Sequence, residues 1–198
     1  MTKPFIIGLT GSIGMGKSTV GAMFEKHGVP VFDADAQVHR MQGPGGQLLE
    51  TIEREFPGTT GPQGVDREKL GGLVFDDKEA LTRLERIVHP AVAAERQAFL
   101  IEHARAPVVV FDIPLLFERG GHERVDAVVV VSAPPEVQRE RVLARPGMTP
   151  EKFARILGLQ MPDAEKRMRA DYVIDTSGTL EQTERAVADL IARLSRSR

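Results

Sequence analysis

Short continuous runs of apolar residues are spaced along the chain, with longer mixed segments between them. Because the runs do not alternate with polar residues, they are typical of strands that are covered on both faces in a parallel sheet. The five runs, of which the last is the weakest, are residues 5–9, 29–32, 108–111, 127–131 and 172–174. Helical patterns separate them, so the chain predicts a doubly wound, three-layer α/β fold with a parallel five-stranded sheet.

Capping residues mark three helix starts between and after these runs. The groups are Asp76 with Glu79, Thr149 with Pro150, and Thr179 with Gln182. The first group opens a long helix, in which Pro90 is expected to cause a kink or a split. The last group opens a C-terminal helix that we expect to run to about residue 194.

A complete phosphate-binding loop (P-loop) pattern, G-x-x-x-x-G-K-S/T, lies directly after the first run, at residues 11–18. A helical segment, 18–26, follows it. The glycines let the backbone wrap around phosphate oxygens, and the helix N-terminus adds a positive pole. Lys17 would reach the β- and γ-phosphates, and Ser18 would offer its hydroxyl to Mg²⁺. A glycine-rich turn without a ligand is the alternative, but strand, loop and helix occur in the required order.

Carboxylates follow two further runs, and ligands of such folds bind at the carboxyl ends of the strands. Asp33 and Asp35 come directly after the second run, where one would orient an acceptor hydroxyl unless it only caps the next helix. We expect Asp35 to be the base and Asp33 to support it. Asp112 ends the third run and would bind Mg²⁺, or be an ordinary strand-end aspartate. Ile113 follows it, whereas a motor ATPase usually has a glutamate there.

Two segments between the predicted strands are longer than one crossover helix requires. Residues 36–107, with a turn-rich break at 57–62, are interpreted as a mostly helical acceptor-binding insert, and residues 135–170 as a lid region. The core of this single domain would be 1–35, 108–134 and 171–198. Basic residues within the lid region would close over the transferring phosphoryl group, or form a solvated helix face. They are Arg139, Arg141, Arg145, Arg155, Lys166, Arg167 and Arg169.

Composition narrows the functional classes. The 198 residues carry 26 Lys plus Arg and 28 Asp plus Glu, a formal net charge of -2, which argues against non-specific nucleic-acid binding. The chain has no cysteine, so it has no disulfide or thiolate nucleophile. No apolar run is long enough for a membrane span, and the first residues do not resemble a signal peptide. We expect a cytoplasmic protein, monomeric or a small homo-oligomer, that binds neither nucleic acid nor membrane.

Taken together, these segments resemble the dephospho-CoA kinase family over nearly the whole chain. Besides the P-loop, the resemblance rests on Asp33-Ala34-Asp35 with His39-Arg40, on Asp66-Arg67, Leu84-Glu85 and His89-Pro90, on 112–118, and on Gln138, Arg141, Arg145, Arg155, Gln160-Met161-Pro162, Lys166 and Ala170-Asp171. It implies Mg²⁺-dependent phosphoryl transfer from ATP to the ribose 3′-hydroxyl of dephospho-CoA. The alternatives are another P-loop small-molecule kinase, such as a nucleoside monophosphate kinase, and a nucleotide-dependent regulatory switch.

The resemblance also implies roles for single residues. Asp35, Lys17 and Arg141 would be catalytic, with Asp33 in support. The acceptor would contact Asp35, His89, Pro90, Leu115 and Leu116, and Mg²⁺ would contact Ser18 and Asp112. The nucleotide would be bound by Gly11, Ser12, Ile13, Gly14, Met15, Gly16, Lys17, Ser18, Thr19, Arg145, Ser177 and Gly178. The loop Asp175-Thr176-Ser177-Gly178 would border the adenine, and it has Thr176 where asparagine is common in the family.

Overall fold

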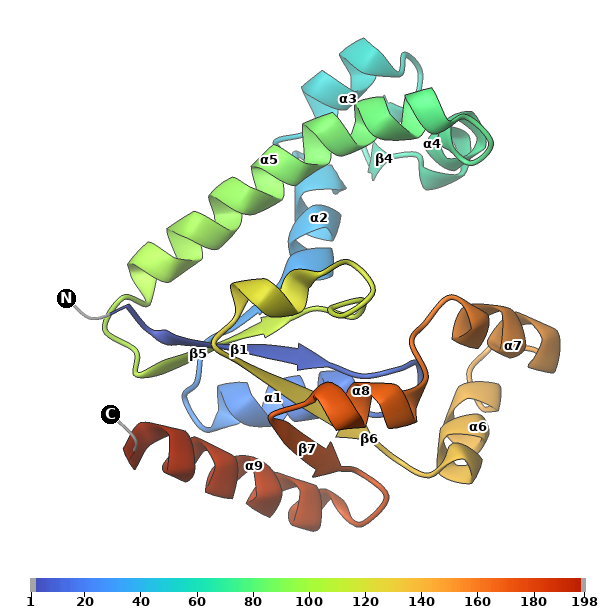
Figure 1. Cartoon of the computed structure of the whole chain (residues 1–198). Coiled ribbons are helices and arrows are strands. Elements are labelled where there is room, and N and C mark those ends of the chain that lie inside the picture. Colours follow the sequence, from blue (N-terminus) through green and yellow to red (C-terminus); the bar gives the residue numbers. More distant parts are fainter. Residues whose placement is uncertain (1–2, 197–198) are drawn as a thin grey trace. The chain divides into compact units, whose positions relative to one another are not determined.

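The computed structural model describes residues 3–196, and its contacts divide the chain into two compact units (Figure 1). The first unit combines Met1–Phe32 with His103–Arg198, and the second is Asp33–Glu102. The second unit therefore interrupts the first, as the predicted insert does, although it begins at Asp33 and ends before the predicted boundary at 107.

A five-stranded parallel sheet forms the centre of the first unit, in the order β2-β5-β1-β6-β7. Its strands are β1 (Phe5–Thr10), β2 (Val31–Asp33), β5 (Val108–Asp112), β6 (Ala127–Ser132) and β7 (Tyr172–Asp175). Each strand overlaps one of the predicted runs, although β2 begins two residues later than its run. The residues of β5 and β6 are all buried, which is why these strands are apolar up to their last residues, Asp112 and Ser132. Leu9 lies opposite Asp112 in the register, so β1 and β5 end side by side.

Helices lie between and after the strands of the first unit (Figure 1). They are α1 (Lys17–Lys26), α6 (Pro135–Leu143), α7 (Pro150–Gly158), α8 (Asp163–Arg169) and α9 (Leu180–Arg196), with a 3₁₀ turn, η1 (Gly121–Arg124). Helices α1 and α9 lie against each other, and α8 lies against β6. The main core is continuous from the sheet into α1 and α9, through residues such as Ile7, Phe24, Val110 and Leu190.

Two of the three predicted caps are confirmed. Thr149 accepts a hydrogen bond from Lys152 N at 3.3 Å at the start of α7. Thr179 and Gln182 form a reciprocal capping box before α9: Gln182 N donates to Thr179 Oγ1 at 3.2 Å, and Thr179 N donates to Gln182 Oε1 at 2.8 Å.

The predicted cap at Asp76 is wrong by one residue. Helix α5 (Lys78–Glu102) begins at Lys78, and the side chain of Asp77 accepts from Glu79 N and Ala80 N at 2.9 and 3.0 Å. Pro90 does not split this helix. It lies exposed inside 25 continuous helical residues, which tolerate the loss of one backbone hydrogen bond.

The second unit is mostly helical, as predicted. Its helices are α2 (Ala34–Gln42), α3 (Leu49–Glu55), α4 (Arg67–Val74) and α5. They enclose a separate small core formed by Met41, Leu48, Ile52, Phe56, Leu70 and Ala80. This unit also contains a two-stranded antiparallel hairpin that the sequence pattern did not predict, β3 (Thr60–Gly61) with β4 (Gly64–Val65).

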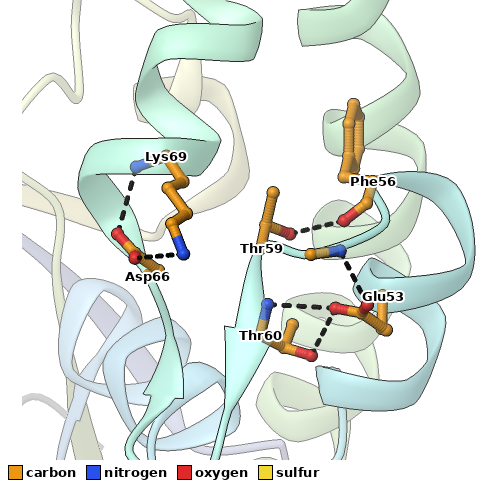
Figure 2. Close-up of polar contacts among 7 residues, drawn as sticks. Glu53, Phe56, Thr59, Thr60, Asp66 and Lys69 are labelled. Carbon is orange, nitrogen blue, oxygen red and sulfur yellow. Dashed lines mark hydrogen bonds and ion pairs between the residues drawn. The ribbon is translucent and has the colours of Figure 1, made fainter.

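Side-chain hydrogen bonds hold the turn before this hairpin (Figure 2). The Glu53 carboxylate accepts from Gly58 N at 2.7 Å, from Thr60 N at 3.0 Å and from Thr60 Oγ1 at 2.7 Å. These bonds, the one from Gly58 first, lower the pKa of Glu53. Asp66 caps α4 by accepting from Lys69 N at 3.1 Å (Figure 2).

Candidate functional site

The P-loop has the tight geometry that its glycines allow. Gly14 and Gly16 have φ angles of 79° and 89°, in the left-handed region that favours glycine. A Cβ at Gly11 would lie 2.7 Å from the carbonyl oxygen of Val131, and a Cβ at Gly14 would collide with Val142. The loop therefore packs closely on β6 and α6. Gly16 begins α1 without a side-chain cap, so the first N–H groups of this helix form a positive pole suited to phosphate.

A charged pair lies beside the loop, because β1 and β5 are neighbours. Lys17 forms an ion pair with Asp112, the last residue of β5. Both side chains are largely buried, with relative exposures of 17% and 7%. Ser18 follows Lys17 in α1 and is exposed. A carboxylate and a hydroxyl are oxygen ligands of the kind that Mg²⁺ accepts, so Asp112 and Ser18 fit the predicted metal contacts.

The outer side of the P-loop is held by side chains from distant segments. Ile13 N donates to Gln160 Oε1 at 3.1 Å, and Gln138 Nε2 donates to Ile13 O at 2.7 Å. Thr176 Oγ1 donates to Met15 O at 2.7 Å. The residue pattern gave no signal for these contacts, because more than 120 residues separate the partners in each pair.

A hollow of about 290 Å³ lies between the P-loop, α6 and the loop after β7. Arg141 donates there through Nη1 to Thr176 Oγ1 at 3.0 Å and through Nη2 to Thr176 O at 2.6 Å. The hollow is lined by Gly14, Gly16, Thr19, Arg141, Arg145, Thr176, Gly178, Leu180 and Thr183. The structure thus brings together two predicted lid arginines, the P-loop and Gly178. Ser177, next to Gly178, is exposed.

The two aspartates predicted to act on the acceptor have different environments. Asp33 caps α2, and its Oδ1 accepts from Ala36 N at 2.9 Å. Asp35 lies exposed in the first turn of the same helix. His89 and Pro90, also predicted near the acceptor, are exposed on α5. Asp33 thus has the capping role that was an alternative for one of the pair, and the carboxylate of Asp35 is exposed.

The pair Leu115 and Leu116 divides between surface and core. Leu115 is half-buried, whereas Leu116 is 0% exposed and packs with Phe117, Val128 and Val130. Packing in the core therefore accounts for the side chain of Leu116, and Leu115 is the member of the pair with an accessible side chain.

Lys166 is not a lid cation, contrary to its grouping with the lid arginines. Its side chain is 0% exposed, and Nζ lies 3.0 Å from Oε1 of Glu118. The same oxygen accepts from Met161 N at 2.7 Å. Burial raises the pKa of Glu118, but the hydrogen bond from Met161 and the interaction with Lys166 outweigh this effect and leave the pKa below its ordinary value. The sequence pattern could not reveal that Lys166 is buried, because a lysine in a helix rich in basic residues is expected to be exposed.

Within residues 3–196, the structure contains no helix that combines the length and the apolar character needed to cross a membrane.

The sequence of this chain is similar to that of one family of known proteins. A family model described as dephospho-CoA kinase matches residues 5–182. The dephospho-CoA kinase of Novosphingobium aromaticivorans is 69% identical over 191 residues, covering 96% of this chain and 95% of the relative. That of Rhodopseudomonas palustris strain HaA2 is 54% identical over 198 residues, covering 98% of each.

Solved structures show the same fold. TT1252 from Thermus thermophilus has a TM-score of 0.80 at 42% identity, covering 98% of this chain and 99% of that chain. Dephospho-CoA kinase from Campylobacter jejuni has a TM-score of 0.67 at 24% identity, covering 96% and 97%. Shikimate kinase from Acinetobacter baumannii has a TM-score of 0.55 at 19% identity, covering 98% and 95%, which extends the likeness of fold to another P-loop kinase.

Proposed function

The chain belongs to the dephospho-CoA kinase family, and on this premise we propose that it transfers the γ-phosphoryl group of ATP to the ribose 3′-hydroxyl of dephospho-CoA. This reaction is the last step of coenzyme A synthesis. The observation that carries the proposal is the match to dephospho-CoA kinases over almost the whole chain, combined with a P-loop whose glycines, Lys17 and Ser18 are all present.

The nucleotide half of the mechanism uses the P-loop. The amides of this loop and the start of α1 would bind the triphosphate, and the 290 Å³ hollow beside it would receive the adenosine. When phosphate arrives, Lys17 would exchange its contact with Asp112 for one with the β- and γ-phosphates. Arg141, already beside the P-loop through Thr176, would stabilise charge on the transferring group.

Asp112 and Ser18 would hold Mg²⁺ together with the phosphates, and the ion would neutralise charge that develops on the phosphoryl oxygens. Exchange of the Lys17 contact would let the Asp112 carboxylate contact the ion in place of the ammonium group.

The acceptor half of the mechanism uses Asp35. Phosphoryl transfer needs an oriented nucleophile, and a carboxylate that accepts a hydrogen bond from the 3′-hydroxyl supplies this orientation and takes the proton. Asp35 is exposed, whereas Asp33 is engaged in capping α2. This difference supports Asp35 as the base and Asp33 as the residue that holds the start of the helix.

Acceptor dependence tests the proposal. ADP release would be measured with MgATP alone and with dephospho-CoA, AMP, CMP or shikimate added. We expect rapid ADP release with dephospho-CoA only. Equal ADP release with every acceptor, or a rate that rises with a nucleoside monophosphate instead, would contradict the proposal.

A further inference from the structure

The peptide groups of the P-loop are held in alternating directions by contacts on its outer side. Gln138 Nε2 binds the carbonyl of Ile13, and Thr176 Oγ1 binds the carbonyl of Met15. In a planar trans peptide, the carbonyl of one residue and the N–H of the next point in opposite directions. The two contacts therefore direct the amides of Gly14 and Gly16 to the other side of the loop, away from Gln138 and Thr176.

The peptide before these two is fixed as well. Gln160 Oε1 accepts from Ile13 N at 3.1 Å, which turns the carbonyl of Ser12 in the opposite direction, where it accepts from Met15 N at 3.1 Å. Three of these hydrogen bonds come from side chains outside the loop, and the fourth, from Met15 N to Ser12 O, closes a turn within it. A glycine-rich backbone would otherwise lose this arrangement easily, since glycine populates both signs of φ.

The residues that make these contacts are themselves anchored. Gln138 is 6% exposed and Thr176 is 6% exposed, so both sit in the packed interior. Gln160 is held through its neighbours: Gln160 N donates to Leu157 O at 3.0 Å, and Met161 N donates to Glu118, the partner of the buried Lys166. A rigid support of this kind is what a preorganised site requires.

From these contacts we infer that Gln138 and Thr176 are positioning residues, which orient the amides of Gly14 and Gly16 toward the phosphates of the nucleotide. The donors are then in place before ATP binds, so they stabilise the charge of the transferring group without reorganisation. Gln160 completes the support by fixing the preceding peptide. The inference rests on the proposed function for its kinetic consequence, but its consequence for nucleotide binding does not depend on the acceptor.

A matched pair of variants isolates the direction of the hydrogen bond. Gln138→Glu and Gln160→Glu each add one negative charge next to Ile13, the first beside its carbonyl and the second beside its N–H group. At position 160 the carboxylate still accepts from Ile13 N, whereas at 138 it faces the carbonyl of Ile13 and has no hydrogen to donate. We expect Gln138→Glu to weaken MgADP binding and to lower kcat about tenfold or more relative to Gln160→Glu.

Uncharged variants supply the second comparison. Gln138→Met and Thr176→Val each remove one donor to the P-loop at similar volume, and both are expected to lower kcat and nucleotide affinity about tenfold, with KM for dephospho-CoA within about twofold of wild type. Because Thr176 Oγ1 also accepts from Arg141 Nη1, Gln138→Met is the variant that isolates the loss of such a donor. Thr176→Ser keeps the hydroxyl and should restore most of the loss. Leu159→Ala, next to Gln160 and 75% exposed, serves as the control for altering this segment.

MgADP affinity would be measured by calorimetry without acceptor, kcat and both KM values in a coupled assay, and folding by the thermal unfolding midpoint. Wild-type nucleotide affinity and kcat in Gln138→Met and Thr176→Val, or equal losses in the two Gln→Glu variants, would overturn the inference. The inference would also be overturned if each variant lost nucleotide binding only to the extent that its protein was unfolded. If wild-type protein fails to phosphorylate dephospho-CoA while the variants still lose MgADP affinity, the proposed function fails and the positioning role stands.

Discussion

Asp33 and Asp35 differ in what they contact, and this difference predicts different effects of substitution. Asp33 accepts from Ala36 N, and asparagine caps helices nearly as well as aspartate, so Asp33→Asn should keep the helix and most of the activity. Asp35→Asn should lower kcat by roughly 100-fold or more, because it removes the base, with little change in KM for ATP. Steady-state kinetics of the two variants separates them. If Asp33→Asn lost most of its kcat while Asp35→Asn kept nearly all of it, the assignment of the base would be reversed.

The buried pair of Lys166 and Glu118 predicts a large effect on stability. Glu118→Gln leaves a fully buried ammonium without its counter-charge, so the free energy of unfolding should fall by about 3 to 5 kcal/mol. Combining it with Lys166→Met should recover much of the loss. Glu165→Gln is the matched control: it removes the exposed partner of Arg169, and should change stability by less than about 1 kcal/mol. Urea unfolding measures all three, and similar losses for Glu118→Gln and Glu165→Gln would contradict this account.

The same pair predicts how stability depends on pH. Folding lowers the pKa of Glu118, so its contribution to stability is complete above the ordinary pKa of glutamic acid, about 4.3, and is lost as the pH falls through the lower folded value. The difference in unfolding free energy between wild type and Glu118→Gln should therefore shrink as the pH is lowered from about 6 to about 3. Urea titrations at several pH values test this, and a difference that grows toward acid would refute it.

At the scale of elements, the P-loop predicts a contrast between two glycines with nearly equal φ angles, 79° at Gly14 and 75° at Gly28. A Cβ at Gly28 would meet no atom within 4 Å, so Gly28→Ala should cost only the backbone strain, about 1 to 2 kcal/mol. Gly14→Ala adds a collision with Val142 and should distort the loop, abolishing nucleotide binding. Calorimetry with MgADP and thermal unfolding compare the two. Retained nucleotide affinity in Gly14→Ala would show that the loop does not need its tight geometry.

The elements also show what the sequence could and could not predict. The strands were predictable because burial on both faces makes continuous apolar runs, and the P-loop because its spacing is specific. The hairpin of β3 and β4 was not, since each strand has two residues and a side chain, Glu53, holds the turn before it. Only the family resemblance pointed to Gln138 and Gln160, because their contacts with Ile13 depend on the tertiary fold.

At the scale of the whole molecule, the predicted site residues divide between the two compact units. The first unit contains the residues predicted to bind nucleotide and metal, and the structure gathers most of them around the P-loop and its hollow. The second unit contains Asp33, Asp35, His89 and Pro90, predicted to act on the acceptor, whereas Leu115 and Leu116 of the predicted acceptor contacts belong to the first unit. Parallel topology explains why the first set could be predicted, because strand ends converge. The acceptor set depends on a helical insert whose fold the strand pattern does not specify.

The proposed reaction forms one particular bond, so the most direct measurement follows the phosphoryl group itself. Wild-type protein would be incubated with Mg²⁺, dephospho-CoA and ATP labelled at the γ-phosphate, and the products identified by ³¹P NMR and mass spectrometry. We expect one ADP for each coenzyme A formed, with the label in a phosphomonoester on the ribose 3′-oxygen. Label released as inorganic phosphate while dephospho-CoA stays unchanged, or label on a different hydroxyl, would contradict it.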